Sequence, residues 1–272
     1  MPRFPFVLLL CFLLTAALAA GALAAPVAEA PAEGIVREVV DGDTLVLESG
    51  EAIRLVGIQA PKLPLGRPDF PAQPLAEEAK FLLGKLTLGK PVSWRLSGRK
   101  TDRHGRLLAH LFDAEGGWIQ GEMLSQGLAR VYSFADNRER VAEMLALERE
   151  ARDARRGIWA DPFYRVLSPE ETLTRLGRFE LVEGRVQKAA AVKGRGYLNF
   201  GEDWRSDFTI VLDPSVRRLF ERQAIAIASY AGKRVRVRGW LKSFNGPMIE
   251  ATHPEQIEIL PEEEGEESLR RP

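Results

Sequence analysis

Hydrophobic and polar residues alternate along several short segments in the first half of the chain, which is the period of half-buried β-strands. The segment Val36–Leu47 alternates on both sides of Asp41-Gly42-Asp43, a composition typical of a tight turn, so it predicts two paired strands. Three more strands are predicted at Ile53–Ile58, Val92–Leu96 and Leu107–Phe112. Together these segments predict a curled, five-stranded antiparallel sheet.

Helical spacing of apolar residues follows or interrupts these strands. It predicts helices at Leu75–Leu86, Trp118–Gly127 and Arg138–Arg155, and the five prolines within 61–74 predict a loop before the first of them. A five-stranded sheet with inserted and appended helices has the order of an oligonucleotide/oligosaccharide-binding (OB) barrel. The fold class expected for residues 34–160 is therefore mainly β with α, an α+β domain built on a five-stranded barrel.

A second set of elements follows a Pro-containing linker at residues 161–177. Residues 178–260 show three strand segments, a helix beginning at Pro214, and closing strand segments. The strands are Phe179–Ala190, Tyr197–Phe200, Phe208–Leu212, Arg234–Leu241 and Met248–Ile259, and the helix is Pro214–Tyr230. This order predicts a second OB-like barrel.

The two ends of the chain have compositions that do not suit a packed domain. Arg3, an apolar run from Phe6 and the small-residue site Ala22-Leu23-Ala24 are typical of a signal peptide, predicted at residues 1–24. A flexible leader is expected at 25–33 and an acidic disordered tail at 261–272. The predicted location is periplasmic or secreted, without integral membrane association after cleavage. An uncleaved membrane anchor is the alternative.

Composition excludes few functions. The formal net charge of zero names no polyanionic partner, and the three histidines are too scattered for a zinc site. No Ser-His-Asp or Cys-His arrangement is visible. The only cysteine, Cys11, lies in the predicted signal peptide, so the mature protein would have no thiol. The sequence gives no indication of an oligomeric state.

Five short strings, in a fixed order, carry a specific resemblance. They are Val40-Asp-Gly-Asp-Thr44, Ile53-Arg-Leu-Val-Gly-Ile58, Thr101-Asp-Arg-His-Gly-Arg106, Gly127-Leu-Ala-Arg-Val131 and Gly157-Ile-Trp159. Over about 125 residues the chain thereby resembles the staphylococcal nuclease (thermonuclease) family, whose domain is an OB-type barrel. The resemblance implies hydrolysis of phosphodiesters in DNA and RNA with one calcium ion.

The resemblance also implies roles for individual residues. Asp43 would bind calcium, with Asp41 nearby as a second carboxylate, and Arg54 and Arg106 would bind the scissile phosphate. Arginine suits that role because its bidentate donors stay protonated. The residues implied to bind the rest of the substrate are Arg103, His104 and Tyr132.

One string departs from the family's pattern. Where the family has Asp-Thr-Pro-Glu or Asp-Ala-Pro-Glu, this chain has Gln59-Ala60-Pro61-Lys62. Gln59 and the Ala60 carbonyl still offer neutral oxygens, but calcium affinity depends on ligand charge, so any calcium is expected to bind weakly. Lys62 stands at the position of the catalytic glutamate, and an ammonium there repels a divalent cation and cannot act as a base.

The sequence leaves open whether the chain is an enzyme. Glu77 or Glu78 could replace the missing base, or Lys62 could itself serve as the cation beside Arg54 and Arg106. One hypothesis is an exported nuclease-type phosphodiesterase with weak or altered metal dependence. The alternative is a non-catalytic envelope protein that binds nucleic acid or another ligand through its barrels.

The rear segment carries no catalytic signature. Alternation in Lys233–Arg238 places Arg234, Arg236 and Arg238 on one strand face, and aromatic residues are interleaved with basic ones. The aromatic residues are Tyr197, Phe200, Trp204, Trp240 and Phe244. Such a pattern suits either a single-strand-binding face or solvated arginines over an aromatic core.

We expect the mature chain to begin near Ala25, because the Ala-x-Ala site ends there. N-terminal sequencing of the exported protein measures this directly. Recovery of the protein in the membrane fraction with residues 1–20 still attached would contradict it.

Overall fold

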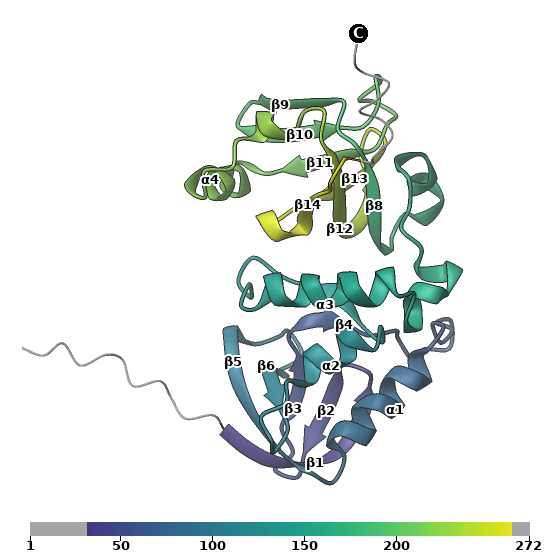
Figure 1. Cartoon of the computed structure of the whole chain (residues 1–272), viewed down its shortest axis with the longest axis vertical. Helices are drawn as coiled ribbons and strands as arrows, with labels where there is room; N and C mark the ends of the chain where they lie inside the picture. The colour runs from purple at the N-terminus through teal and green to yellow at the C-terminus, as the bar shows by residue number, and fades with distance from the viewer. Residues whose placement is uncertain (1–31, 263–272) are drawn as a thin grey trace, which may run out of the picture. The chain divides into compact units, whose positions relative to one another are not determined.

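The computed structural model of this protein describes residues 32–262 (Figure 1). The predicted signal peptide, residues 25–31 of the predicted leader and residues 263–272 of the predicted tail lie outside this range. Strand β1 begins at Ala32, two residues before the predicted domain boundary. No helix within the described range is long and apolar enough to cross a membrane.

A closed five-stranded barrel forms the front of the described chain, as predicted. Its strands follow the order β1–β2–β3–β6–β5. They are β1 (Ala32–Asp41), β2 (Thr44–Leu47), β3 (Ala52–Leu55), β5 (Pro91–Thr101) and β6 (Leu107–Phe112). The tight turn at residues 42–43 and four of the predicted strand segments are confirmed.

The prediction that this sheet is entirely antiparallel is wrong, because β3 and β6 are parallel. The reason is geometric. Five strands in a closed ring cannot alternate in direction all the way round, so at least one adjacent pair must be parallel. The parallel pair joins β3, which carries Arg54, to β6, which directly follows Arg106.

The predicted strand Ile53–Ile58 is two strands rather than one. It breaks at Val56, whose N–H donates to the Ala109 carbonyl, and continues as β4 (Gly57–Gln59). Strand β4 leaves the barrel and pairs with β7 (Arg130–Tyr132), a strand that the sequence did not predict. The break places Gln59 beside Arg130 instead of on the barrel.

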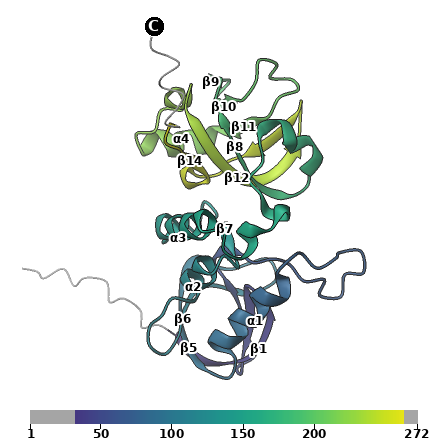
Figure 2. The same cartoon turned by 45° about the vertical axis from the view of Figure 1, so that its right-hand side comes forward.

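Helices cover the barrel where the apolar spacing predicted them. They are α1 (Ala76–Thr87), α2 (Ile119–Ser125) and α3 (Val141–Asp153). Helix α1 lies beside β1 in both views and buries Ala76, Ala79 and Leu83 (Figures 1 and 2). The barrel core therefore closes against the helix that follows the Pro-rich loop.

The rear elements form a seven-stranded sheet, so the predicted second barrel is not confirmed. The strands are β8 (Phe179–Arg185), β9 (Lys188–Val192), β10 (Arg195–Asn199), β11 (Thr209–Leu212), β12 (Arg234–Ser243), β13 (Pro247–Glu250) and β14 (Ile257–Ile259). The predicted helix is shorter: α4 (Pro214–Arg222) ends before Ala224, whose φ of 58° no helix accepts, and a 3₁₀ turn follows at Ile227–Tyr230.

The join between the two parts is ordered. Two 3₁₀ turns lie in it, Pro162–Tyr164 and Pro169–Arg175, and another, Gly157–Ala160, directly precedes it. A further 3₁₀ turn lies at Pro254–Gln256, before β14. A capping box links Ser168 and Glu171. The Tyr164 hydroxyl donates to the Pro74 carbonyl at 2.8 Å, which ties the join to the end of the Pro-rich loop.

The arginines of the basic row on β12 form ion pairs within the molecule. Arg234 and Arg236 both contact Glu183, and Arg238 is fully buried between Glu148 of α3 and Glu258 of β14, at 2.8 and 2.6 Å. Burial alone would raise the pKa of Glu148, but the charge and hydrogen bonds of Arg238, together with the Arg152 charge and the Val131 N–H, outweigh it and lower that pKa. Arg238 therefore joins the two parts of the chain, whereas Arg234 and Arg236 are paired within the rear sheet, and the row does not form a free nucleic-acid-binding face.

Substituting Arg238→Met should lower the free energy of unfolding by about 3–5 kcal/mol, because it leaves the buried Glu148 carboxylate without its main partner. Urea denaturation at pH 7 measures this. The control is Lys242→Met, which removes an exposed pair with Glu250 and should cost about 0–1 kcal/mol. Equal losses in the two variants would contradict the structural role of Arg238.

Candidate functional site

The β1–β2 turn holds two carboxylates under the barrel surface. The Asp43 N–H donates to Asp41 Oδ1 at 3.0 Å, which fixes the turn, and Asp43 is fully buried. Gly42 allows a close approach, because a Cβ there would lie 2.6 Å from the Ala60 Cβ and 2.7 Å from the Ala79 Cβ. The missing side chain thus brings the loop after β4 and helix α1 up to the two acids.

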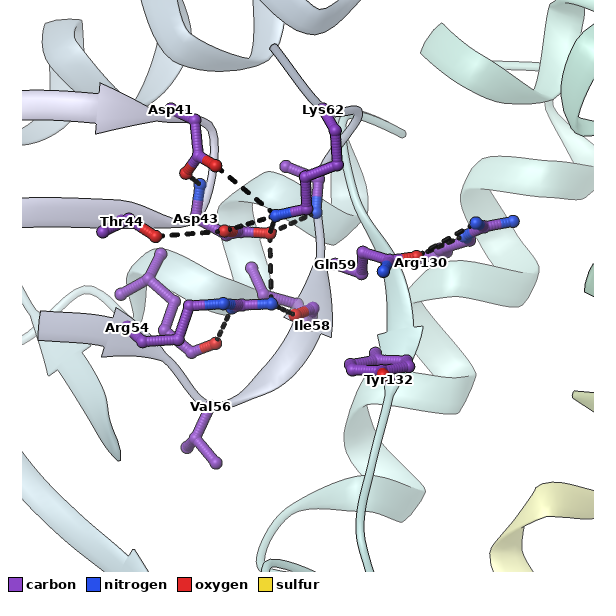
Figure 3. A network of polar contacts seen from close by, with 12 residues as sticks. Asp41, Asp43, Thr44, Arg54, Val56, Ile58, Gln59, Lys62, Arg130 and Tyr132 are labelled. Carbon is purple, nitrogen blue, oxygen red and sulfur yellow. Dashed lines mark hydrogen bonds and ion pairs between the residues drawn. The ribbon is translucent and has the colours of Figure 1, made fainter. Parts of the chain in front are cut away.

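Both oxygens of Asp43 are fully engaged (Figure 3). Lys62 Nζ donates to Oδ1 at 2.8 Å and to Oδ2 at 2.6 Å, and Oδ2 also accepts from the Ala60 N–H at 2.8 Å. Arg54 Nη2 lies 3.2 Å from Oδ2, and the Thr44 hydroxyl donates to Oδ1 at 3.3 Å. One carboxylate is therefore neutralised by two cations.

The Pro-rich loop fixes Lys62 in this position. The Lys62 N–H donates to the Gln73 side-chain oxygen and the Gln73 N–H donates to the Lys62 carbonyl, both at 2.9 Å. The ammonium also lies 3.5 Å from Asp41 Oδ2. A reciprocal pair of hydrogen bonds at the loop's base thus positions the ammonium against the acids.

Burial and neighbouring charge act in opposite directions on the two acids. Burial would raise the pKa of Asp43, but Arg54 and Lys62 outweigh it and hold that pKa well below its usual range. The pKa of Asp41 is raised, by burial first and then by the Asp43 charge, and the Lys62 charge only partly offsets these effects. Asp41 is therefore protonated more readily than Asp43.

Gln59 points away from this cluster. Its side-chain oxygen accepts from Arg130 Nε at 3.2 Å and Nη2 at 3.0 Å, across the β4–β7 pair (Figure 3). Sequence reasoning missed Arg130, although it stands in one of the strings that carry the resemblance. The signal in the sequence is a lone arginine between two apolar residues, Ala129 and Val131. The structure buries both of these neighbours completely.

Arg106 is positioned by the turn before β6. It contacts Asp102 Oδ2 through Nη2 at 2.6 Å, and its Nη1 donates to the Thr44 hydroxyl at 3.2 Å. Asp102 Oδ1 also accepts the N–H groups of His104 and Arg106. Thr44 therefore connects Arg106 to Asp43 through one hydroxyl.

A cleft of about 560 Å³ opens beside these arginines. The lining brings together five predicted residues: Arg54, Arg103, His104, Arg106 and Tyr132. The predicted metal ligands and Lys62 are not part of this lining. The structure thus separates the predicted site into a basic cleft and a buried acid–ammonium cluster, with Arg54 in both.

Several residues of the lining were not assigned to the site from the sequence, and three of them contribute to its charge or to its aromatic wall. Arg99, Phe134 and Trp240 also line the cleft. Trp240 comes from β12 of the rear sheet, and its indole N–H donates to the Tyr132 hydroxyl at 3.0 Å. Phe134 packs edge-on against Tyr132 at a centroid distance of 4.8 Å. One wall of the cleft is aromatic, and both parts of the chain build it.

Glu77 and Glu78 do not reach the acids. Both are exposed in the first turn of α1 and line a separate hollow with Phe81. Among the described residues, no hydrogen bond or ion pair joins either glutamate to Asp43, Arg54 or Arg106. The geometry does not support a replacement base at these positions.

The donor set at Asp43 does not fit a calcium ion. Calcium requires six to eight oxygen ligands, several of them charged. Here the Asp43 lone pairs are used by Lys62, Arg54 and Ala60, and the Gln59 oxygen is turned to Arg130. Within residues 32–262, no group of three or more His, Cys, Asp or Glu side chains is arranged to hold a metal.

Comparison with known proteins identifies the family. The staphylococcal nuclease homologue family matches residues 52–161. Protein ParB of Escherichia coli is 33% identical over 159 residues, which cover 53% of this chain and 84% of that protein. An uncharacterized endonuclease of Escherichia coli O157:H7 is 34% identical over 139 residues, covering 50% of this chain and 82% of its own length.

A larger relative matches this chain over a small part of its own length. Endonuclease YhcR of Bacillus subtilis is 31% identical over 146 residues, which cover 50% of this chain but 12% of that protein. The fold, the ordered strings and these matches define a protein of nuclease-type descent. The chain belongs to the staphylococcal nuclease homologue family.

Changing Gln59→Asp and Lys62→Glu together should raise calcium affinity at least about tenfold, because two charged ligands replace an amide and a cation. Isothermal titration calorimetry measures the gain. The single Lys62→Glu variant is made alongside, since Arg130 would attract the acid introduced at position 59.

Lys85→Glu is the matched control, with the same charge change at an exposed site on α1. It should leave calcium affinity unchanged. Calcium binding by the unmodified protein with a Kd below about 10⁻⁴ M, tighter than weak extracellular sites, would contradict the interpretation of the Lys62 contacts.

Proposed function

We propose that this protein binds a nucleic-acid strand in the basic cleft and does not cleave it by a calcium-dependent reaction. The observation that carries the proposal is the Lys62 ammonium, which donates to both oxygens of the buried Asp43 carboxylate. The position that the family resemblance assigns to calcium is thus served by a cation from the chain itself.

The cleft offers no free carboxylate to deprotonate a water. A general base must lie within hydrogen-bond reach of the proton that it removes and must be free to accept it. Asp102 is held by Arg106 at 2.6 Å, and Asp136 is held by Arg99 at 3.2 Å. Both acids of the lining are therefore bound to arginines, and the family's glutamate position is occupied by Lys62.

The cleft suits a phosphate backbone with unpaired bases. Four arginines line it against two acids, so the lining is net positive, which attracts a polyanion. Tyr132, Phe134 and Trp240 supply flat apolar surfaces, and Phe134 and Trp240 are about half exposed, at 47% and 46%. Arginines that follow a backbone beside rings that stack on bases are typical of single-strand binding.

Export belongs to the same proposal. It is supported by the apolar N-terminal run and the Ala22-Leu23-Ala24 site, which are typical of a cleaved signal peptide. A protein in the envelope or outside the cell would meet extracellular nucleic acid.

Fluorescence anisotropy with a labelled 12-nucleotide DNA strand in EDTA should show binding that weakens as salt rises. Arg103→Ala should lower the salt slope by about 1, because Arg103 forms no ion pair with an acid among the described residues and is available to a phosphate. Trp240→Ala should weaken binding by about 1–3 kcal/mol without changing the slope, because it removes a stacking surface and no charge.

Arg195→Ala is the control for charge, since Arg195 is exposed, pairs with Asp213 and lies outside the cleft. The same strand is incubated with calcium to test cleavage. Cleavage by the unmodified protein in calcium, but not in EDTA, would refute the proposal. Cleavage only by the variant that carries Gln59→Asp and Lys62→Glu would support it.

A further inference from the structure

A second cleft, of about 410 Å³, lies on the rear sheet, away from the residues assigned to nucleic acid. Its floor is one face of β9, β10, β11 and β13, reached by residues at every second position: Tyr197 and Asn199 of β10 and Thr209 and Val211 of β11. The intervening residues Leu198 and Ile210 are fully buried in the core. The cleft is thus the outer face of a sheet whose inner face is packed.

Two aromatic side chains from loops stand at the edge of this floor. Trp204 is 50% exposed and Phe244 is 73% exposed, and both line the cleft. The Arg205 guanidinium lies over the Trp204 ring at 4.5 Å. Two large exposed rings that converge on one cleft are typical of a ligand-binding surface.

The two loops that carry these rings lie against each other. Asp203 caps its own turn by accepting from the Arg205 N–H at 3.1 Å and the Ser206 hydroxyl at 2.9 Å. At the tip of the β12–β13 hairpin, a Cβ on Gly246 would lie 2.9 Å from the Ser206 backbone. Only glycine permits this contact between the loop of Trp204 and the loop of Phe244.

The polar groups of the cleft are mostly neutral. Asn199 accepts from the Thr209 hydroxyl at 3.3 Å, which leaves its NH₂ group without a hydrogen-bond partner among the described residues. The Asn245 carboxamide likewise makes no side-chain hydrogen bond within residues 32–262. Lys188 is the single charged residue of the lining. The basic cleft, in contrast, has four arginines.

This lining favours an uncharged ligand with flat apolar faces and many hydroxyl groups. A phosphate backbone would need a row of cations, which the lining lacks. A pyranose ring presents a C–H face to an aromatic ring and hydroxyls at its edge to carboxamides. We propose that this cleft binds a neutral oligosaccharide, with Trp204 and Phe244 against the sugar faces and Asn199 and Asn245 bonding to its polar groups.

The test uses the full mature chain, ¹⁵N-labelled, titrated with cellotetraose and, separately, with the tetramer of N-acetylglucosamine. At least one tetrasaccharide should shift resonances of the cleft residues, with a Kd on the order of 1 mM. Trp204→Ala and Phe244→Ala should each weaken that binding about tenfold. Asn245→Gly should weaken it as well, and glycine suits the φ of 52° at that position, so the fold is kept.

Two control variants match these changes. Phe81→Ala removes an equally exposed ring from α1, and Trp240→Ala removes the indole of the basic cleft. Neither should alter sugar binding. Absence of binding by both tetrasaccharides, or equal losses in the controls, would overturn the proposal. So would loss of oligo-dT₁₂ binding in Trp204→Ala, which would assign the cleft to nucleic acid instead.

Discussion

A carboxylate without any contact with water is the constraint around which the front half of this protein is organised. An ionised Asp43 in the barrel wall costs several kcal/mol of lost hydration unless cations and N–H donors surround it. The chain supplies them from three places: the β3 arginine, the loop lysine and the N–H of Ala60. The β1–β2 turn, the β3–β4 break and the Pro-rich loop must therefore all reach one point.

A lysine and a metal ion can both neutralise a buried carboxylate, but they do so differently. A bound metal brings two charges and open coordination positions, but it depends on free ions and on several anionic ligands. A lysine brings one charge, uses its protons on the acids and cannot leave the chain. In this structure the charge of Asp43 is thus balanced by Lys62 and Arg54, two cations of the chain itself.

The sequence predicted the parts of this molecule that depend on local pattern. Alternation located four barrel strands and helical spacing located α1 to α3, whereas Asp43, Arg54 and Arg106 were named only through the family resemblance of the ordered strings. It did not predict β4 and β7, because three-residue strands leave almost no period. It also could not show that Gln59 would turn to Arg130 or that Lys62 would lie on Asp43, since both contacts join residues that the chain separates widely.

In the rear sheet, too, the sequence pattern predicted local geometry but not long-range contacts. Alternation correctly placed Arg234, Arg236 and Arg238 on one face, but it carried no information on what that face meets. The aromatic residues divided in two: Phe200 is buried, whereas Trp204, Trp240 and Phe244 stay exposed beside clefts. Composition alone does not show which of these rings are buried and which are exposed. That depends on where the fold places the segments that carry them.

The buried Glu148–Arg238 pair joins residues that are synthesised far apart in time. Glu148 is part of α3, which follows the last barrel strand in the chain, whereas Arg238 is ninety residues further along. A growing polypeptide that has released the whole barrel still lacks that guanidinium, and the remaining cation near Glu148, Arg152, lies 3.5 Å away. Domains usually mature from the N-terminus as they are synthesised. Until β12 has been added, the acid of α3 therefore lacks its main partner.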